Sequence, residues 1–310
     1  MRVAAPAVAV MLALFAGRAR AGELAALAPP SGDDARKAVA IGPSGEVYEP
    51  DGKGAWVRRQ RITTADKLAV AGRAGGAIVA GGDGVVYRLA ANGWTALRLA
   101  QTGKAVLSSG AAVAAVGRQL YALDKSNGGE LVKLALAPAT VLAIGAGKQL
   151  AIATERGLFR VAGTKLTKIP GAPRRVDALV GDAWALLDHG ALELATKKVT
   201  RWPAGLSISV AVTGPTNSLV AVGTSRGKLE LVTLRAGKLE REPIAVSPAA
   251  KAVGVAVDKM GRAVVALRDG RLVVRQAVAG GAAAPGNWTV STVSESLPPA
   301  HPGSPPAKGP

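Results

Sequence analysis

Cysteine is absent from the 310 residues of the chain, and histidine occurs only twice. The protein therefore has no disulfide, no thiolate nucleophile and no thiolate ligand for a metal. His189 lies in a turn-like sequence, Asp188-His189-Gly190, and His301 lies in a proline-rich stretch near the C-terminus. Metal centres that need several imidazoles are disfavoured by this scarcity. We accordingly expect no metal, no cofactor and no catalytic residue.

Aromatic residues are also scarce, at 3% of the chain, and charged residues reach only 19%. Hydrophobic residues, mainly Ala, Val and Leu, make up 49% of the chain, which is enough for a folded core and excludes bulk disorder. Glycine (39 residues) and proline (19 residues) recur at short intervals, which disfavours long helices.

Long hydrophobic runs are missing as well. The longest, from Val3 to Phe15, has about a dozen residues, fewer than the roughly 20 that span a bilayer as a helix. It follows Arg2 and precedes the small-residue sequence Ala19-Arg20-Ala21, an order that is typical of a secretory signal peptide. We predict that residues 1–21 are this signal and that the protein is exported, to the periplasm or outside the cell. An uncleaved membrane anchor is the alternative.

Acidic residues are in deficit, with 21 Asp and Glu against 39 Lys and Arg, a net charge of +18. Removal of the signal takes away Arg2, Arg18 and Arg20 and no acid, which leaves +15. A charge of this size attracts polyanions over long range and in a salt-sensitive manner. The basic residues form no dense run, so two interpretations stay open: binding of an anionic envelope polymer, and solubility alone.

The dominant pattern is an internal repeat of about 40 residues. Each copy has an apolar run, a Gly-containing turn, a second short run, another turn and a third run, most clearly in residues 77–99 and 149–171. The other copies are 38–60, 111–137, 182–204, 218–244 and 262–278. Glycine opens the second run in six of these seven copies, at Gly45, Gly84, Gly157, Gly190, Gly227 and Gly270, with Arg118 in the remaining one.

A further short apolar run precedes each copy from the second onward, as in 207–215 and 251–259. Each unit thus contains four runs of strand length, with turn residues at the joints. Four-stranded units of about 40 residues in series are typical of a β-propeller. We predict an all-β fold, a single β-propeller of seven four-stranded blades over residues 22–296, followed by a disordered Pro-rich tail at 297–310. A ring of six or eight blades and a pair of β-sandwiches are the alternatives.

Closure of the ring is the least determined feature of this prediction. The first blade must take its inner strand from about 23–27, and the seventh must take its outer strand from about 287–293.

One repeat carries a resemblance to a known group of proteins. The sequence of residues 150–170, LAIATERGLFRVAGTKLTKIP, resembles the propeller repeats in the sensor regions of bacterial two-component regulators and in related exported propellers. Their unit runs as a strand, Gly-Leu-aromatic-Arg, a Gly turn and a final strand, and residues 79–99 resemble it in part. The chain lacks the Trp that usually starts that repeat, and it has no kinase. The resemblance implies a propeller that binds a ligand or a partner.

Motifs of enzyme chemistry occur only as fragments. Residues 223–227 fit the Gly-x-Ser-x-Gly pattern of hydrolases, but they lie between two predicted strands, and His301 is the only later histidine. Residues 145–148 (Gly-Ala-Gly-Lys) lack the spacing and the following helix of a phosphate loop. We interpret both as hairpin turns. The acids to which we assign capping of turns are Asp83, Asp182, Asp188, Asp258 and Asp269.

Four of the five tryptophans fall in predicted outer strands: Trp56, Trp94, Trp202 and Trp288. Trp184 lies in the second strand of the fifth unit. A large amphipathic ring is a natural filler between blades, and we favour that interpretation. Because Trp anchors many protein interfaces, the same four residues are the candidate partner-binding residues.

These observations favour an exported, non-enzymatic propeller that acts as a binding or scaffolding module in the cell envelope. Its ligand would be a protein partner or an anionic polymer, bound by the loops at one end of the ring or by the basic rim. The main alternative is a propeller enzyme of the lyase or lactonase type, with Asp, Glu and His gathered at the central channel. A third hypothesis, an assembly partner in the periplasm, requires an exposed apolar patch on the ring.

Overall fold

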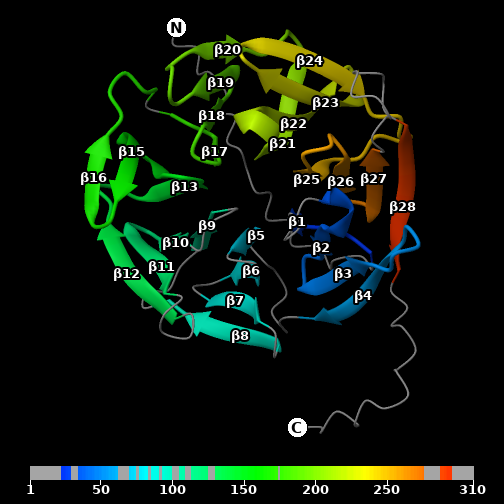
Figure 1. Cartoon of the computed structure of the whole chain (residues 1–310), viewed down its shortest axis with the longest axis horizontal. Coiled ribbons are helices and arrows are strands. Elements are labelled where there is room, and N and C mark those ends of the chain that lie inside the picture. Colours follow the sequence, from blue (N-terminus) through cyan, green and yellow to red (C-terminus); the bar gives the residue numbers. More distant parts are fainter. Residues whose placement is uncertain are drawn as a thin grey trace, which may run out of the picture.

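The computed structural model of the chain is a closed ring of seven four-stranded β-sheets around a central axis, as predicted (Figure 1). The predicted signal peptide (1–21) and tail (297–310) lie outside the described residues. The structure describes residues 22–28, 34–61, 70–74, 77–82, 85–90, 93–99, 105–108, 113–124, 130–173, 175–275 and 287–294.

Each sheet is one blade, and its strands follow the chain from the innermost, A, to the outermost, D. Blade 1 comprises β1 (Ala26–Ala28), β2 (Val39–Ile41), β3 (Glu46–Pro50) and β4 (Trp56–Arg61). Blade 2 comprises β5 (Val70–Ala74), β6 (Ala77–Gly82), β7 (Val85–Ala90) and β8 (Gly93–Arg98). Blade 3 comprises β9 (Ala105–Leu107), β10 (Val113–Val116), β11 (Gln119–Asp124) and β12 (Glu130–Leu136). Blades 4 and 5 are β13 (Val141–Ala146), β14 (Leu150–Thr154), β15 (Gly157–Ala162) and β16 (Lys165–Lys168); and β17 (Ala178–Val180), β18 (Trp184–Leu187), β19 (Gly190–Glu193) and β20 (Val199–Arg201). Blades 6 and 7 are β21 (Leu206–Thr213), β22 (Leu219–Ser225), β23 (Lys228–Arg235) and β24 (Lys238–Pro243); and β25 (Ala252–Val257), β26 (Ala263–Leu267), β27 (Arg271–Arg275) and β28 (Trp288–Ser294).

Two short 3-10 helices, η1 (Ala35–Lys37) and η2 (Pro215–Asn217), connect strands A and B of blades 1 and 6. Among the described residues, no helix is long and apolar enough to cross a membrane.

The ring closes between two blades that are each built from consecutive residues. The inner strand of the first blade and the outer strand of the seventh are β1 and β28, close to the segments predicted for them. The inner strand β1 contacts both β5 and β25. On the outside, β28 pairs in parallel with β4, with Val293 opposite Trp56, and this pairing joins blades 7 and 1 into one eight-stranded sheet.

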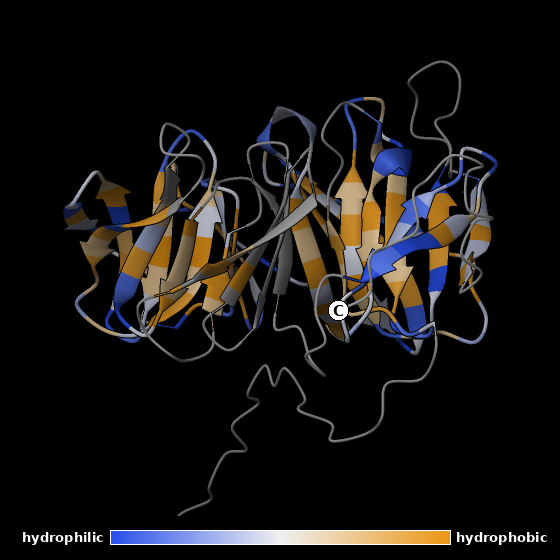
Figure 2. Cartoon of the chain, turned by 90° about the horizontal axis from the view of Figure 1, so that it is seen from below, coloured by the Kyte–Doolittle hydropathy of each residue, from blue (hydrophilic) through white to orange (hydrophobic). Residues whose placement is uncertain are grey.

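Apolar side chains fill the spaces between neighbouring blades, and Figure 2 shows the hydrophobic residues along the strands and the hydrophilic ones in the loops at both ends. Separate buried clusters lie between blades 2 and 3, 3 and 4, 4 and 5, 5 and 6, 6 and 7, and 7 and 1. Near the axis the backbones approach closely, because a Cβ added at Gly145 of blade 4 would lie 2.1 Å from the carbonyl oxygen of Gly181 in blade 5. Small residues are therefore required where inner strands approach this closely.

The repeated glycine lies at the turn between strands B and C. Gly157 and Gly227 have φ angles of 114° and 76°, in the region that favours glycine, so the hairpin geometry explains why this position is repeated.

Antiparallel order gives the ring two distinct ends. Where the structure describes the connections, those from A to B and from C to D lie at one end, which we call the AB/CD end, and those from B to C and to the next blade lie at the other, the BC/DA end.

Candidate binding face

The loops of the AB/CD end expose lysine and arginine side chains in blades 1, 4, 5, 6 and 7. The set comprises Arg36, Lys37, Lys53, Lys148, Lys165, Lys197, Lys198, Arg235, Lys238 and Lys259. None of these loops carries a dense basic run in the sequence, so the fold brings together at this end charges that are separate in the sequence.

The acids of the same loops are turned into the protein and accept hydrogen bonds. Asp51 accepts from the backbone N–H of Lys53 at 2.7 Å and of Ala55 at 3.1 Å, and the first of these bonds lowers the pKa of its carboxyl. Asp182, the turn acid of blade 5, accepts from the backbone N–H of Gln149 in blade 4 at 2.9 Å. Among the acids that the structure describes at this end of blades 1, 4, 5, 6 and 7, only Glu240 is exposed, and it forms an ion pair with Lys238 at 3.0 Å.

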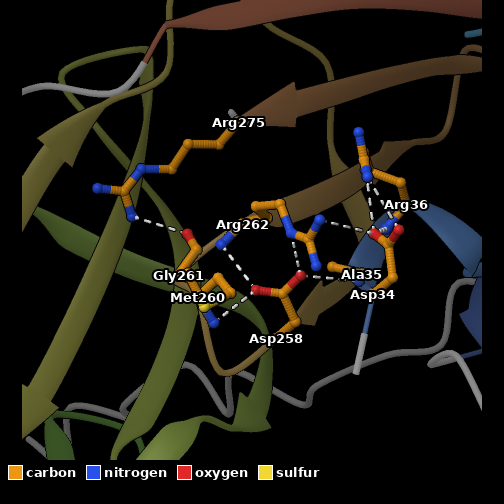
Figure 3. Close-up of polar contacts among 8 residues, drawn as sticks. All are labelled: Asp34, Ala35, Arg36, Asp258, Met260, Gly261, Arg262 and Arg275. Atoms are coloured by element: carbon orange, nitrogen blue, oxygen red, sulfur yellow. Dashed lines mark hydrogen bonds and ion pairs between the residues drawn. The ribbon is translucent and has the colours of Figure 1, made fainter. Parts of the chain in front are cut away.

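Asp258 is the centre of a polar network that joins blades 7 and 1 (Figure 3). Its side chain is 1% exposed and accepts from the backbone N–H groups of Met260 at 2.9 Å and Arg262 at 3.0 Å, which hold the AB turn of blade 7. It also accepts from the guanidinium of Arg262 and, across the blade junction, from the backbone N–H of Ala35 at 3.1 Å. The capping role predicted for Asp258 is confirmed, and the bond to Ala35 extends that role to a second blade.

Asp34 begins η1 on the far side of this junction. Its carboxylate accepts from the backbone N–H and the Nε of Arg36, both at 3.0 Å, and lies 3.6 Å from the guanidinium of Arg262. The hydrogen bonds from the Arg36 side chain hold the pKa of Asp34 below its usual range. Arg36 is thereby held at the surface beside Lys37, which has no acidic partner among the described residues.

A cleft of about 650 Å³ opens between blades 1 and 7 next to this network. Arg36, Lys37, Glu49, Trp56 and Ser291 contribute to its lining. The Ser291 hydroxyl donates to the carbonyl oxygen of Gly54 at 2.6 Å, which links blade 7 to the CD loop of blade 1. The cleft thus has a fixed polar wall and an exposed cationic rim.

Similar polar contacts fix the neighbouring loops of other blades. Gln149 and Asp182 join blades 4 and 5, and the indole N–H of Trp184 donates to the carbonyl oxygen of Asn217 at 2.8 Å to join blades 5 and 6. Glu242 of blade 6 forms an ion pair with Arg275 of blade 7 at 2.8 Å. The cationic loops are therefore carried on a rigid, laterally connected scaffold.

A second pocket, of about 580 Å³, lies at the BC/DA end of blade 5. Arg175, Asp177, Asp188, His189 and Arg201 contribute to its lining. His189 Nε2 lies 3.0 Å from a carboxylate oxygen of Asp188, and both side chains are exposed in the B-to-C turn, as predicted. Burial raises the pKa of Asp177, with the neighbouring Asp188 acting in the same direction and Arg175 and His189 against it.

The tryptophans are spread around the ring, and the structure does not bring them together. Trp56 is 2% exposed, and its indole N–H donates to the carbonyl oxygen of Ala38 at 3.0 Å. Trp288, the first residue of β28, is half-buried, and its indole N–H donates to Glu242 at 2.8 Å. Trp202 directly follows β20 and packs between blades 5 and 6, and Trp94 lies in β8. Packing between blades describes Trp56, Trp184, Trp202 and Trp288, and partner binding by the four candidates stays a prediction.

The two enzyme-like fragments are turns. Ser225 ends β22, and Arg226 and Gly227 form the hairpin to β23, so the Gly-x-Ser-x-Gly fragment has no strand-to-helix context. Lys148 lies in the AB turn of blade 4, where it is exposed. Within the described ranges, no group of three or more His, Cys, Asp or Glu side chains is placed to hold a metal ion.

Sequence reasoning missed most of the cationic face. Lys148 was considered only as part of a phosphate-loop fragment, and the pair Lys197-Lys198 was not singled out. Aligning the repeats on their turn glycine would have revealed the face, because the alignment places these lysines at the A-to-B and C-to-D joints of successive units.

Comparison with known proteins identifies the fold. No family model matches the chain, and no curated protein matches its sequence. Among solved structures, the chain is similar to a streptogramin B lyase (12% identity, TM-score 0.58, covering 82% of this chain and 93% of the lyase) and to the WD40 β-propeller domain of Doa1 (17%, 0.59, 85% and 96%). It is also similar to the extracellular domain of a one-component system from B. thetaiotaomicron (15%, 0.55, 82% and 38%). The resemblance to regulator propellers is thus confirmed at the level of the fold.

Proposed function

We propose that this propeller is an exported, non-enzymatic binding module whose AB/CD end holds an anionic polymer of the cell envelope. The separation of charge carries the proposal: the cations of that end are exposed, whereas Asp34, Asp51, Asp182, Glu193 and Asp258 are at least partly buried. A surface of this kind displaces the counterions of a polyanion, and the resulting affinity falls steeply as salt rises. The proposal that the protein is exported is supported by the signal-like sequence of residues 1–21. Export would bring the protein to the anionic polymers of the cell envelope.

A protein partner is the competing ligand, and it is supported by the WD40 propellers among the similar structures. An apolar docking patch has less support. The large apolar side chains that are exposed among the described residues lie on several blades: Val132, Leu136, Leu142, Val199, Met260 and Val290. Single exposed apolar residues are normal on soluble proteins, whereas a docking patch would group them.

The test compares two charge-reversal pairs that change the net charge equally. Lys37→Glu with Lys53→Glu alters the AB/CD end, and Arg226→Glu with Lys228→Glu alters a hairpin at the BC/DA end. Residues 22–310 of each variant would be titrated against heparin, a sulfated polysaccharide, across a range of salt concentrations. We expect the first pair to weaken binding and to flatten the salt dependence, and the second pair to change both much less. Equal effects would mean that only net charge matters, which contradicts the proposal.

The same proteins would then be used to capture ligands from an envelope fraction. Carbohydrate that is retained at low salt and released at high salt supports a polymer ligand. A single protein retained at high salt would instead assign the face to a protein partner.

The second candidate function is an enzyme of the lyase or lactonase type, and the similarity to a streptogramin B lyase gives it specific support. Its site would be the blade 5 pocket, where two carboxyl groups of different burial, Asp177 and Asp188, share a pocket with His189. Turnover of a panel of lactones by the wild type, lost in Asp177→Asn and kept in Asp182→Asn, would establish it. Under our proposal no turnover is expected.

A further inference from the structure

Four exposed cations flank the junction of blades 5 and 6 at the AB/CD end. Lys197 and Lys198 lie in the CD loop of blade 5, and Arg235 and Lys238 flank the C-to-D hairpin of blade 6. The two loops are in contact, because the Nζ of Lys198 lies 2.7 Å from the position that a Cβ on Gly237 would occupy. A lysine of one blade thus lies over the hairpin of the next.

The CD loop of blade 5 has an uncommon backbone conformation. Lys197 has a φ of 60°, a region that costs a residue with a side chain about 1–2 kcal/mol. Its N–H donates to the carbonyl oxygen of Glu193 at 2.8 Å, and the Glu193 carboxylate accepts from the Thr196 hydroxyl at 2.6 Å. The one acid of the loop is thus engaged within the loop and does not pair with either lysine.

Like charges lie close together at this junction. Arg235 and Lys238 are directly opposite each other in the β23/β24 ladder, an arrangement that destabilises a sheet unless the charges are compensated. Glu240 compensates Lys238, and Lys197, Lys198 and Arg235 have no ion-pair partner among the described residues. An anionic group from a ligand would supply the missing compensation.

Further exposed cations continue from this junction along the loops of the same end. Lys148 and Lys165 lie on blade 4, Lys259 lies on blade 7, and Lys37 and Lys53 lie on blade 1. Blades 4, 5, 6, 7 and 1 are consecutive around the closed ring (Figure 1), and polar contacts join each neighbouring pair. The cations thus follow an arc and do not converge on one cavity.

We infer that the polymer is linear and lies extended along this arc, from blade 4 to blade 1, with the junction of blades 5 and 6 as its strongest contact. The inference rests on the proposed function and specifies the ligand further: a chain with anionic groups at regular intervals. A compact anion of the same chemistry would engage the junction alone.

Size-fractionated heparin oligosaccharides, from tetrasaccharide to hexadecasaccharide, test this inference with mature protein. Lys197→Ala with Lys198→Ala should weaken the binding of every length, whereas Lys37→Ala with Lys53→Ala should weaken only the longer chains. For long heparin, each pair should lower the slope of log affinity against log salt by about 2, since each lost lysine contact lowers it by about 1. All four residues are exposed, and thermal unfolding would verify that the variants fold.

Three outcomes are distinguishable. Affinity that rises with chain length, together with the expected difference between the pairs, supports the arc. Affinity that is independent of length, with the Lys37/Lys53 pair without effect at any length, overturns the arc and leaves a compact site at the blade 5/6 junction within the proposed function. Binding that only the Arg226/Lys228 pair abolishes overturns both.

Discussion

Asp258 is predicted to hold the first and last blades together, and its replacement tests how the ring is closed. Asp258→Ala would leave the backbone N–H groups of Ala35, Met260 and Arg262 without their acceptor, and the Arg262 guanidinium without its closest carboxylate. Asp258 is almost completely buried, so water cannot readily replace it.

The expected loss is about 4 kcal/mol in the free energy of unfolding. Removing one partner of a buried ion pair costs roughly 3–5 kcal/mol, and the Ala35 N–H across the junction belongs to the same network. For a chain of this size, each kcal/mol corresponds to about 2–4 °C, so the melting temperature should fall by about 10 °C.

Urea denaturation and differential scanning calorimetry of residues 22–310 would measure both quantities. Asp51→Ala is the matched control, because Asp51 also caps a loop of the AB/CD end through two backbone N–H groups, and both of these donors belong to its own blade. Hydrogen exchange at Ala35 should accelerate in Asp258→Ala and stay unchanged in Asp51→Ala. If Asp258→Ala cost less than about 1 kcal/mol, or no more than the control, the network would not contribute to closure.

Three further tests, with five substitutions, probe the same scaffold. The hydrogen bonds from Arg36 hold the pKa of the Asp34 carboxyl below its usual value, so the stabilisation by Asp34 is complete above about pH 5 and is lost as pH falls through the folded-state pKa. Unfolding free energies measured between about pH 5 and pH 2 should therefore fall more steeply for the wild type than for Asp34→Asn. Parallel curves would refute this. Gly145→Ala should lower the free energy of unfolding by about 2–3 kcal/mol, because its Cβ would lie 2.1 Å from the Gly181 carbonyl oxygen. Gly163→Ala, at a position with open space and a φ of 58°, should lower it by about 1 kcal/mol. Equal melting temperatures of the two variants would contradict the close approach of blades 4 and 5. Trp56→Phe should lower the free energy of unfolding by about 2 kcal/mol, because it leaves the buried Ala38 carbonyl oxygen without the indole donor. Trp288→Phe should lower it less, because Arg275 still pairs with Glu242. A lower melting temperature for Trp288→Phe than for Trp56→Phe would count against this assignment.

The repeat allowed the blades to be predicted because turn chemistry is local. A position such as Gly157 must be glycine to turn at a φ of 114°, so the hairpins leave a regular mark in the sequence. Closure leaves no such mark, since the pairing of Val293 with Trp56 joins residues far apart in the chain through backbone groups that any residue provides. The segments for β1 and β28 could be named only because the blade count required them.

The candidate face could not be predicted for a related reason. Lys198 and Gly237 are neighbours because two blades pack side by side, and no spacing along the chain encodes that contact. In the sequence Asp182 has the features of an ordinary turn acid, but in the structure its carboxylate accepts a hydrogen bond from the backbone N–H of Gln149 in the preceding blade.

The separation of charge at the AB/CD end follows from the way turns are built. Aspartate is selected at these joints because its short side chain reaches backbone N–H groups, and a carboxylate that caps a turn, as Asp51 and Asp258 do, is drawn toward the protein. Lysine in the same loops has no backbone acceptor within such short reach, and its long side chain extends into water. The capped turns of Asp51 and Asp258 therefore place a carboxylate against backbone N–H groups and expose a neighbouring lysine, Lys53 or Lys259. A chain with nearly twice as many basic as acidic residues thus exposes many cations at this end without a single basic run.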